Sequence, residues 1–145
     1  MRRTVTGLTV LALLAVLGCA NAPAGPGGTA GPGGADDGPR PATAEDLLGR
    51  WYPADGAHRG AAFAEFDADG GWTGSDGCNG QGGTWALDPD GTFAGSAGPS
   101  TLIACDNVPV ARWVGEAGRA EADGGDLLLV PATGDVPARL VRELP

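Results

Sequence analysis

One glycine-rich stretch decides how this chain folds: Gly74-Ser75-Asp76-Gly77-Cys78-Asn79-Gly80-Gln81-Gly82-Gly83-Thr84-Trp85. A second stretch follows downstream, Thr101-Leu102-Ile103-Ala104-Cys105. Glycine permits positive φ and close backbone approach, and an Asn-Gly pair is a turn dipeptide whose amide side chain can bond loop amides. The pattern predicts a fold-defining corner, and a binding role stays open beside it. The candidate residues of the corner are Asp76, Gly77, Asn79, Gln81 and Thr101.

Cys78 and Cys105 are predicted to form a disulfide. Exported chains meet an environment in which cysteines tend to pair, and such a bond stabilises by about 3–4 kcal/mol on the chain-entropy model. Free thiols, or a metal or catalytic role, are the alternatives. A metal site or a catalytic thiol would need further ligands or a base, and His58 is the only histidine of the chain.

Residues 1–18 predict a lipoprotein signal peptide. Arg2 and Arg3 form a basic start, and residues 5–17 are mostly apolar but too short to span a bilayer. The stretch Val16-Leu17-Gly18-Cys19 resembles the bacterial lipobox, in which the cysteine is lipidated and becomes the mature N-terminus. An ordinary secretory signal with a chance cysteine is the alternative. The route of export, general or twin-arginine, stays open.

Residues 19–42 predict a flexible linker, because glycine and proline dominate and apolar bulk is nearly absent. We therefore expect a domain at residues 43–145, anchored to the cell membrane through Cys19 and facing the extracytoplasmic side. From Cys19 onward the chain has 7 arginines, no lysine and 18 acidic residues, a net charge of −11. Such an acidic chain is repelled by phosphate backbones, which argues against nucleic acid as a partner.

The domain reads as mainly β, because short strands alternate with turn signals such as residues 67–71 and 88–91. We expect strands at residues 49–52, 61–66, 72–76, 84–87, 92–95, 126–130 and 138–144. Thr43 followed by Asp46 predicts a capped helical turn. Apolar side chains at 110, 113, 114 and 117 predict one helix, with Asp106 or Asn107 as its cap. The four tryptophans suit a core better than a ligand platform.

The order of these motifs resembles the META domain of HslJ-like envelope proteins. The resemblance rests on Gly77-Cys78-Asn79, on Gly83 before the aromatic Trp85, on Thr101 with Ala104-Cys105, and on Gly125-Asp126-Leu127 after the helix. Leu48-Gly49-Arg50-Trp51 is similar to the opening of that family, so the resemblance covers residues 47–143. It implies a curved antiparallel sheet or partial barrel with one α-helix packed against it. It does not imply an enzyme.

No catalytic set, metal site or cofactor is predicted. Asp67-Ala68-Asp69-Gly70 hints at calcium, but an EF-hand loop needs Gly at its sixth position and Glu at its twelfth, where Trp72 and Cys78 stand. A hairpin turn explains the two acids better. The serines have no credible base, and the acidic residues suit exposed strands and turns.

Three functions from different classes remain. The leading hypothesis is a non-enzymatic, lipid-anchored envelope protein that serves stress response or envelope maintenance by binding a protein or surface component. The alternative is a secreted small β-barrel protease inhibitor, because such inhibitors share an early Gly-x-Trp and a single bridge. A small-molecule binder is the third.

Overall fold

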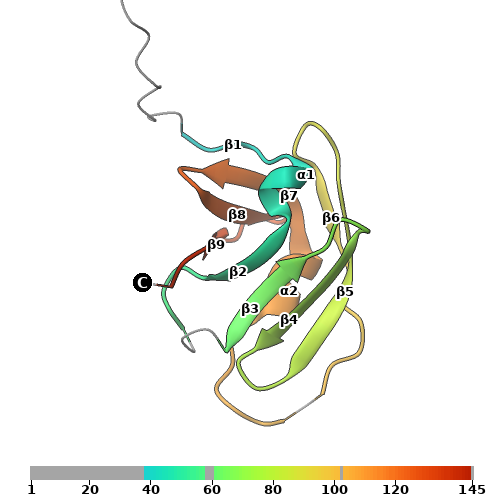
Figure 1. Cartoon of the computed structure of the whole chain (residues 1–145), viewed down its shortest axis with the longest axis vertical. Helices are drawn as coiled ribbons and strands as arrows, with labels where there is room; N and C mark the ends of the chain where they lie inside the picture. The colour runs from blue at the N-terminus through green and yellow to red at the C-terminus, as the bar shows by residue number, and fades with distance from the viewer. Residues whose placement is uncertain (1–37, 58–60, 102, 145) are drawn as a thin grey trace, which may run out of the picture. The chain divides into compact units, whose positions relative to one another are not determined.

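The computed structural model describes residues 38–57, 61–101 and 103–144 (Figure 1). Nine strands form one antiparallel sheet that curls into a half-barrel, in the order β1-β7-β8-β9-β2-β3-β4-β5-β6. The prediction of a mainly β, curved sheet with a packed helix is confirmed. Within these described ranges, no helix is both long and apolar enough to cross a membrane.

The elements follow each other in this order: β1 (Arg40–Pro41), α1 (Ala44–Leu47), β2 (Gly49–Pro53), β3 (Ala62–Phe66), β4 (Gly71–Asp76), β5 (Gly80–Leu87), β6 (Phe93–Gly95), α2 (Val110–Glu116), β7 (Ala117–Asp123), β8 (Asp126–Pro131) and β9 (Ala138–Val141).

The inner face of the sheet is apolar because the strands alternate in burial. On β3 the side chains of Ala62, Ala64 and Phe66 are buried, and the residues between them are half-buried. On the paired strand β4, Trp72 and Asp76 are buried on the same face. Asp76 is therefore a carboxylate at the end of an otherwise apolar row.

Helix α2 packs against β3, β4, β6 and β8 and covers part of this inner face. Val110 and Val114 are buried in the core on this helix. The contact with β6 is close because Gly95 has no side chain: a Cβ there would lie 2.2 Å from the carbonyl oxygen of Val114. The helix is thereby fixed over the inner face of β3 and β4, near Asp76.

Local signals in the sequence are matched by local structure. Thr43 Oγ1 accepts a hydrogen bond from the Asp46 amide at 3.3 Å, and the Asp46 carboxylate accepts one from the Thr43 amide at 2.7 Å, so the capping box of α1 is present. The turn between β3 and β4 closes as a hairpin, in which Asp69 Oδ1 accepts from the Gly71 amide. This bond supports the hairpin interpretation of the two acids.

Several features differ from the sequence-based expectation. Strand β5 begins at Gly80 and not at residue 84, so part of the predicted corner lies in a strand, and Ala117, expected on the helix, is the first residue of β7. Strand β7 was not predicted, because it consists of alanine, glycine and charged residues and carries no β-branched or aromatic residue. Arg40 and Pro41 fall in the expected linker, yet they pair with β7, and the neighbouring Ala42 is buried in the core. The prediction that Asp106 or Asn107 caps α2 is wrong, since the N-cap residue is Pro109, which makes no side-chain cap bond.

Candidate functional site

The glycine-rich corner and its downstream partner lie side by side as two antiparallel chain segments. We call residues 98–108, of which all but 102 are described, the tethered segment. Its contacts with residues 76–82 run in strict antiparallel order. At one end, the Gly98 amide donates to the Gly82 carbonyl at 2.7 Å, and Ser100 Oγ donates to the Gly80 carbonyl at 3.2 Å. In the middle, the Ile103 amide donates to Asn79 Oδ1 at 2.7 Å. At the other end, Cys105 is bonded to Cys78, and Asn107 Nδ2 donates to Asp76 Oδ2 at 2.9 Å.

Asp76 is the centre of this arrangement. Its side chain is only 2% exposed, and its carboxylate accepts five hydrogen bonds from uncharged donors. Oδ1 accepts from the amides of Cys78 at 2.8 Å and Asn79 at 2.6 Å. Oδ2 accepts from the side-chain amides of Asn79 at 3.0 Å, Gln81 at 3.3 Å and Asn107 at 2.9 Å. One buried carboxylate thus joins β4, β5 and the tethered segment.

The charge of Asp76 is retained despite its burial. Burial disfavours the ionised form and by itself would raise the pKa of the carboxyl group. The hydrogen bonds from the amide and side chain of Asn79, the amide of Cys78 and the side chain of Asn107 outweigh this effect and lower the pKa to about 2. The carboxylate is therefore ionised at neutral pH and holds its donors as charge-assisted bonds, which are stronger than neutral ones.

Asn79 holds the tethered segment by its backbone. Its side chain is 3% exposed and contacts both polar groups of Ile103: Oδ1 accepts from the amide at 2.7 Å, and Nδ2 donates to the carbonyl at 3.3 Å. A side chain here replaces the neighbouring strand that would otherwise pair with this backbone. Ile103 itself is 62% exposed.

Gln81 links the corner to α2. Its Oε1 accepts from the Ala111 amide at 3.0 Å, in the first turn of α2, while its Nε2 donates to Asp76. The first amides of a helix have no partner within the helix and need an acceptor from elsewhere. Gln81 therefore provides, from strand β5, the cap that Asp106 and Asn107 do not provide.

Two glycines of the corner are required by geometry. Gly77 has a φ of +104°, a conformation that residues with a side chain rarely adopt. At Gly83 a Cβ would lie 2.0 Å from the Ser96 carbonyl oxygen and 2.9 Å from Trp72 Nε1. Because Gly83 has no side chain, the Trp72 indole reaches that carbonyl at 2.7 Å. Gly83 thus allows a core tryptophan to satisfy its N–H.

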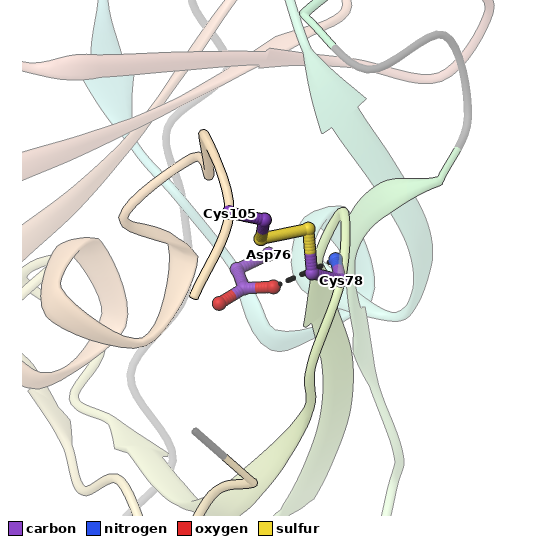
Figure 2. A group of neighbouring side chains, drawn as sticks. All are labelled: Asp76, Cys78 and Cys105. Atoms are coloured by element: carbon purple, nitrogen blue, oxygen red, sulfur yellow. Dashed lines mark hydrogen bonds between the residues drawn. A yellow bond between two sulfur atoms is a disulfide. The ribbon is translucent and has the colours of Figure 1, made fainter. Parts of the chain in front are cut away.

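The predicted disulfide between Cys78 and Cys105 is present, and it lies directly beside Asp76 (Figure 2). The two sulfurs and a carboxylate oxygen of Asp76 all lie within 4.8 Å of one another. Cys78 is half-buried and Cys105 is exposed. With the sulfurs bonded to each other and the carboxylate bonded to five donors, the oxidised group acts as a cross-link between the two segments.

Most of the predicted corner residues line a shallow depression of about 390 Å³. Asp76, Asn79 and Gln81 line it together with Thr101 and Ile103. Gly77 is not part of its lining; it shapes the turn behind it. Among the described residues, no buried side-chain nitrogen or oxygen lacks a hydrogen-bond partner, so the buried polar groups of the depression are already engaged within the protein.

Sequence reasoning missed two residues of this site. Asn107 was expected as a helix cap but donates to Asp76. Ile103 had no assigned role, although an exposed isoleucine in a stretch rich in small and polar residues is a usable signal. Trp51 and Trp72 are buried in the core as expected, while Trp85 and Trp113 are partly buried and pack against it.

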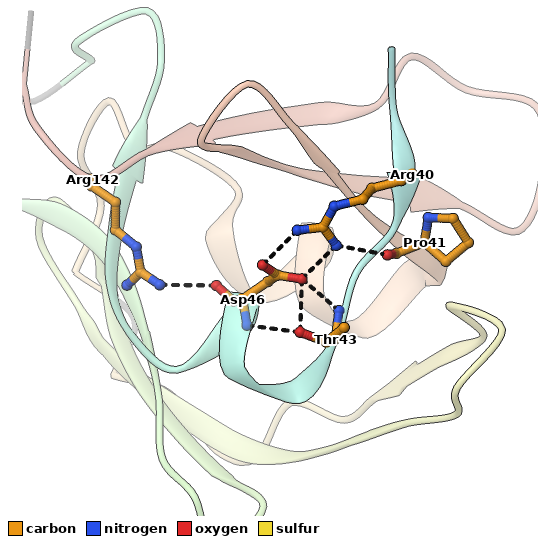
Figure 3. A network of polar contacts seen from close by, with 5 residues as sticks. All are labelled: Arg40, Pro41, Thr43, Asp46 and Arg142. Carbon is orange, nitrogen blue, oxygen red and sulfur yellow. Dashed lines mark hydrogen bonds and ion pairs between the residues drawn. The ribbon is translucent and has the colours of Figure 1, made fainter. Parts of the chain in front are cut away.

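A second polar network joins the two ends of the domain (Figure 3). Arg40 makes a two-pronged ion pair with Asp46 at 2.8 and 2.9 Å, and this bond, together with those from Thr43, holds the pKa of Asp46 well below its usual range. Arg142 lies over the ring of Trp51 at 3.6 Å and donates to the carbonyl oxygens of Asp46 and Arg50. Partial burial lowers the pKa of Arg142. This network joins the N-terminal and C-terminal parts of the domain and has a structural role. The glycine-rich corner is therefore the candidate site.

Comparison with protein-family models, with curated proteins and with solved structures finds no match for this chain. Several parts of the sequence analysis lie outside the described residues: the predicted signal peptide at residues 1–18, Cys19, the expected linker up to residue 37, His58 and Leu102. The candidate site is therefore defined by the geometry of the corner and the tethered segment alone.

Proposed function

We propose that this chain is a non-enzymatic binding protein of the cell envelope, anchored by lipid at Cys19, which presents the tethered segment to a protein partner. The observation that carries this proposal is the backbone clamp of Asn79 on Ile103. A buried amide, a buried carboxylate and a disulfide together fix a segment most of whose residues are exposed, although Val108 at its end is buried in the core. Binding costs less free energy when the contacting segment is already ordered.

The shape of the surface favours a protein over a small molecule. Small ligands are bound in concave pockets that enclose most of their surface, whereas the depression at the corner is shallow and its buried polar groups are engaged. Ile103, at the edge of this depression, has 62% of its area exposed and is one of three large apolar residues that are exposed among the described residues. An exposed aliphatic side chain on a fixed backbone suits the centre of a protein interface.

The sequence supports the location. The leader, the lipobox-like residues 16–19 and the Gly/Pro-rich stretch after them fit a domain held near the extracytoplasmic side of a membrane. The disulfide fits the same compartment. The Gly77-Cys78-Asn79 motif and the curled sheet with a packed helix support a place in the META-domain family, with a role in stress response or envelope maintenance.

Site-specific photocrosslinking tests the proposal. A photoreactive amino acid replaces Ile103 in the full chain, expressed in the cells that produce it, and a matched variant carries the same group at Thr73. Thr73 is also exposed, but it lies on β4 outside the tethered segment. We expect a discrete protein adduct at position 103 and none at 73. Equal adduct patterns at both positions would remove the tethered segment from partner binding.

The anchor is tested separately. Cys19→Ala should leave the domain folded but release it from the membrane fraction, and it should abolish incorporation of a labelled fatty acid. Membrane retention and labelling that persist in Cys19→Ala would exclude lipidation at this residue.

The same clamp also favours the protease-inhibitor alternative. Inhibitors that bind like substrates present an exposed segment whose backbone is held by the scaffold, and Ile103 is held by Asn79 next to a disulfide. A panel of extracellular proteases decides this point. Nanomolar inhibition that is lost in Ile103→Asp would assign inhibition to this segment, and its absence would leave the envelope-binding function.

A further inference from the structure

The two cysteines and Asp76 lie close together, and reduction of the disulfide would turn them into two thiols beside a carboxylate. Their ligand atoms lie within 4.8 Å of one another, which is close enough for three donors to share one cation. We propose that reduction of the Cys78–Cys105 disulfide creates a zinc site, in which one Zn²⁺ is bound by the two cysteine sulfurs and the Asp76 carboxylate. This inference does not depend on the proposed envelope function.

The chemistry balances with a dithiol as the reductant. The dithiol supplies two electrons and two protons, its own sulfurs form a disulfide, and the Cys78–Cys105 bond is replaced by two thiols. Binding of Zn²⁺ then releases the two thiol protons to solvent. Two thiolates, one carboxylate and one water give the four-coordinate geometry that zinc prefers. Soft sulfur ligands select zinc over magnesium and calcium.

The scaffold keeps the three donors together when the disulfide is broken. The tethered segment remains joined to the corner on both sides of Cys105: Asn79 holds Ile103, and the Val108 amide donates to the Asp76 carbonyl at 2.9 Å. The Cα atoms of the two cysteines are 6.7 Å apart. The chain therefore holds the sulfurs near each other without relying on the bond between them.

Asp76 is oriented as metal-bound carboxylates are. Such carboxylates are usually held by hydrogen bonds from surrounding residues, and here five donors fix its position. A cation needs one lone pair of Asp76, so one of these five contacts must lengthen when the cation binds. Solvent access is available because Cys105 is exposed.

The test uses the full chain with Cys19→Ala, so that Cys78 and Cys105 are its only thiols. The protein is reduced with a phosphine, which takes the oxygen of one water to become the phosphine oxide while the disulfide becomes two thiols. It is then freed of reductant without air and titrated with Zn²⁺ in competition with a chromophoric chelator. The same chain left oxidised is the control. We expect one Zn²⁺ per reduced chain, competitive with the chelator, and none for the oxidised chain. Equal binding in both forms, or none in the reduced form, overturns the proposal.

The identity of the ligands is tested by X-ray absorption and by one further variant. X-ray absorption of the reduced zinc form should show two sulfur neighbours at about 2.3 Å and two oxygen neighbours near 2.0–2.2 Å. Four sulfurs, as in a site shared by two chains, or no sulfur would contradict the assignment. Reduced Asp76→Asn, checked by circular dichroism for its fold, should bind at least tenfold more weakly, and unchanged binding would remove Asp76 from the site.

Discussion

The buried side chain of Asn79 holds the backbone of the exposed Ile103 at both of its polar groups. The amide of Ile103 donates to Asn79 Oδ1 at 2.7 Å, and its carbonyl accepts from Asn79 Nδ2 at 3.3 Å. Asn79 is itself fixed by Asp76, which accepts from both its amide and its side chain. The order of an exposed segment therefore depends on two buried polar side chains.

Replacement of Asp76 by Asn should destabilise the domain and change its response to acid. The asparagine side chain has no negative charge, so it cannot replace the carboxylate as the acceptor of five hydrogen bonds. A hydrogen bond to a charged group contributes about 1.5–3 kcal/mol to stability. In the native protein the pKa of Asp76 lies at about 2, below its ordinary value of 3.8, so the folded state binds the proton less tightly than the unfolded state. The stability from Asp76 is thus complete above about pH 4 and is lost as the pH falls towards 2.

Urea unfolding at a series of pH values between 7 and 2 measures this effect. The pKa of Asp46 is also lowered, so Asp46 contributes a loss of stability in acid in both the wild type and the variant. The unfolding free energy of Asp76→Asn should therefore fall less steeply between pH 4 and 2 than that of the wild type. An identical slope in the two proteins would mean that folding does not lower the pKa of Asp76.

Replacement of Gln81 by Ala should weaken the start of α2. The change removes the acceptor of the Ala111 amide, and loss of a helix cap costs roughly 1 kcal/mol. Chemical denaturation measures the loss, and hydrogen exchange should quicken at Ala111. Arg112→Ala is a suitable control, because it removes only exposed ion pairs, with Glu116 on the same helix and with Asp135. A loss no larger than in this control would show that Gln81 is not the cap.

Gly83→Ala should be far more damaging than Gly80→Ala, although both residues lie on β5. At position 83 the added methyl group would meet the Ser96 carbonyl at 2.0 Å and press on the Trp72 indole, whereas at position 80 nothing lies within 4 Å. Overpacking of this kind costs about 1–3 kcal/mol. The difference is measured as a shift of the urea midpoint, and equal midpoints would contradict the close contact at Gly83.

Reduction of the disulfide should lower the free energy of unfolding by about 3–4 kcal/mol on the chain-entropy model. The bond joins residues 27 apart in sequence, and it acts mainly by restricting the unfolded chain. Unfolding of oxidised and reduced protein in metal-free buffer measures the loss. Cys78→Ser with Cys105→Ser should match the reduced protein, and a double variant as stable as the oxidised form would exclude a stabilising role for the bond.

The sequence predicts those parts of the fold that depend on near neighbours. The capping box of Thr43 and Asp46 and the hairpin turn at Asp69 are local patterns, and both form as expected. Strand β7 escaped prediction because alanines such as Ala120 carry little strand preference, and their burial depends on the curl of the whole sheet. Single-residue patterns do not report such tertiary burial.

The sequence predicts which residues form the candidate site, but not which of them bond to each other. The Asp, Asn and Gln of the corner stood out beside Cys78, yet no spacing rule links Gln81 to the Ala111 amide or Asn107 to Asp76. These bonds join residues about 30 positions apart, which meet only because the tethered segment runs antiparallel to the corner. Asn107 stood next to a predicted helix start, so local reasoning assigned it the nearer role.

Hydrogen exchange at the Ile103 amide tests the central claim most directly. If the corner holds the tethered segment, this amide should exchange slowly in the oxidised wild type although the side chain beside it is exposed. In Asn79→Ala, with the disulfide intact and the core amide of Ala64 as an internal reference, it should exchange far faster while the reference stays protected. Rapid exchange in the wild type, or equal protection in both proteins, would contradict the claim that Asn79 orders this segment.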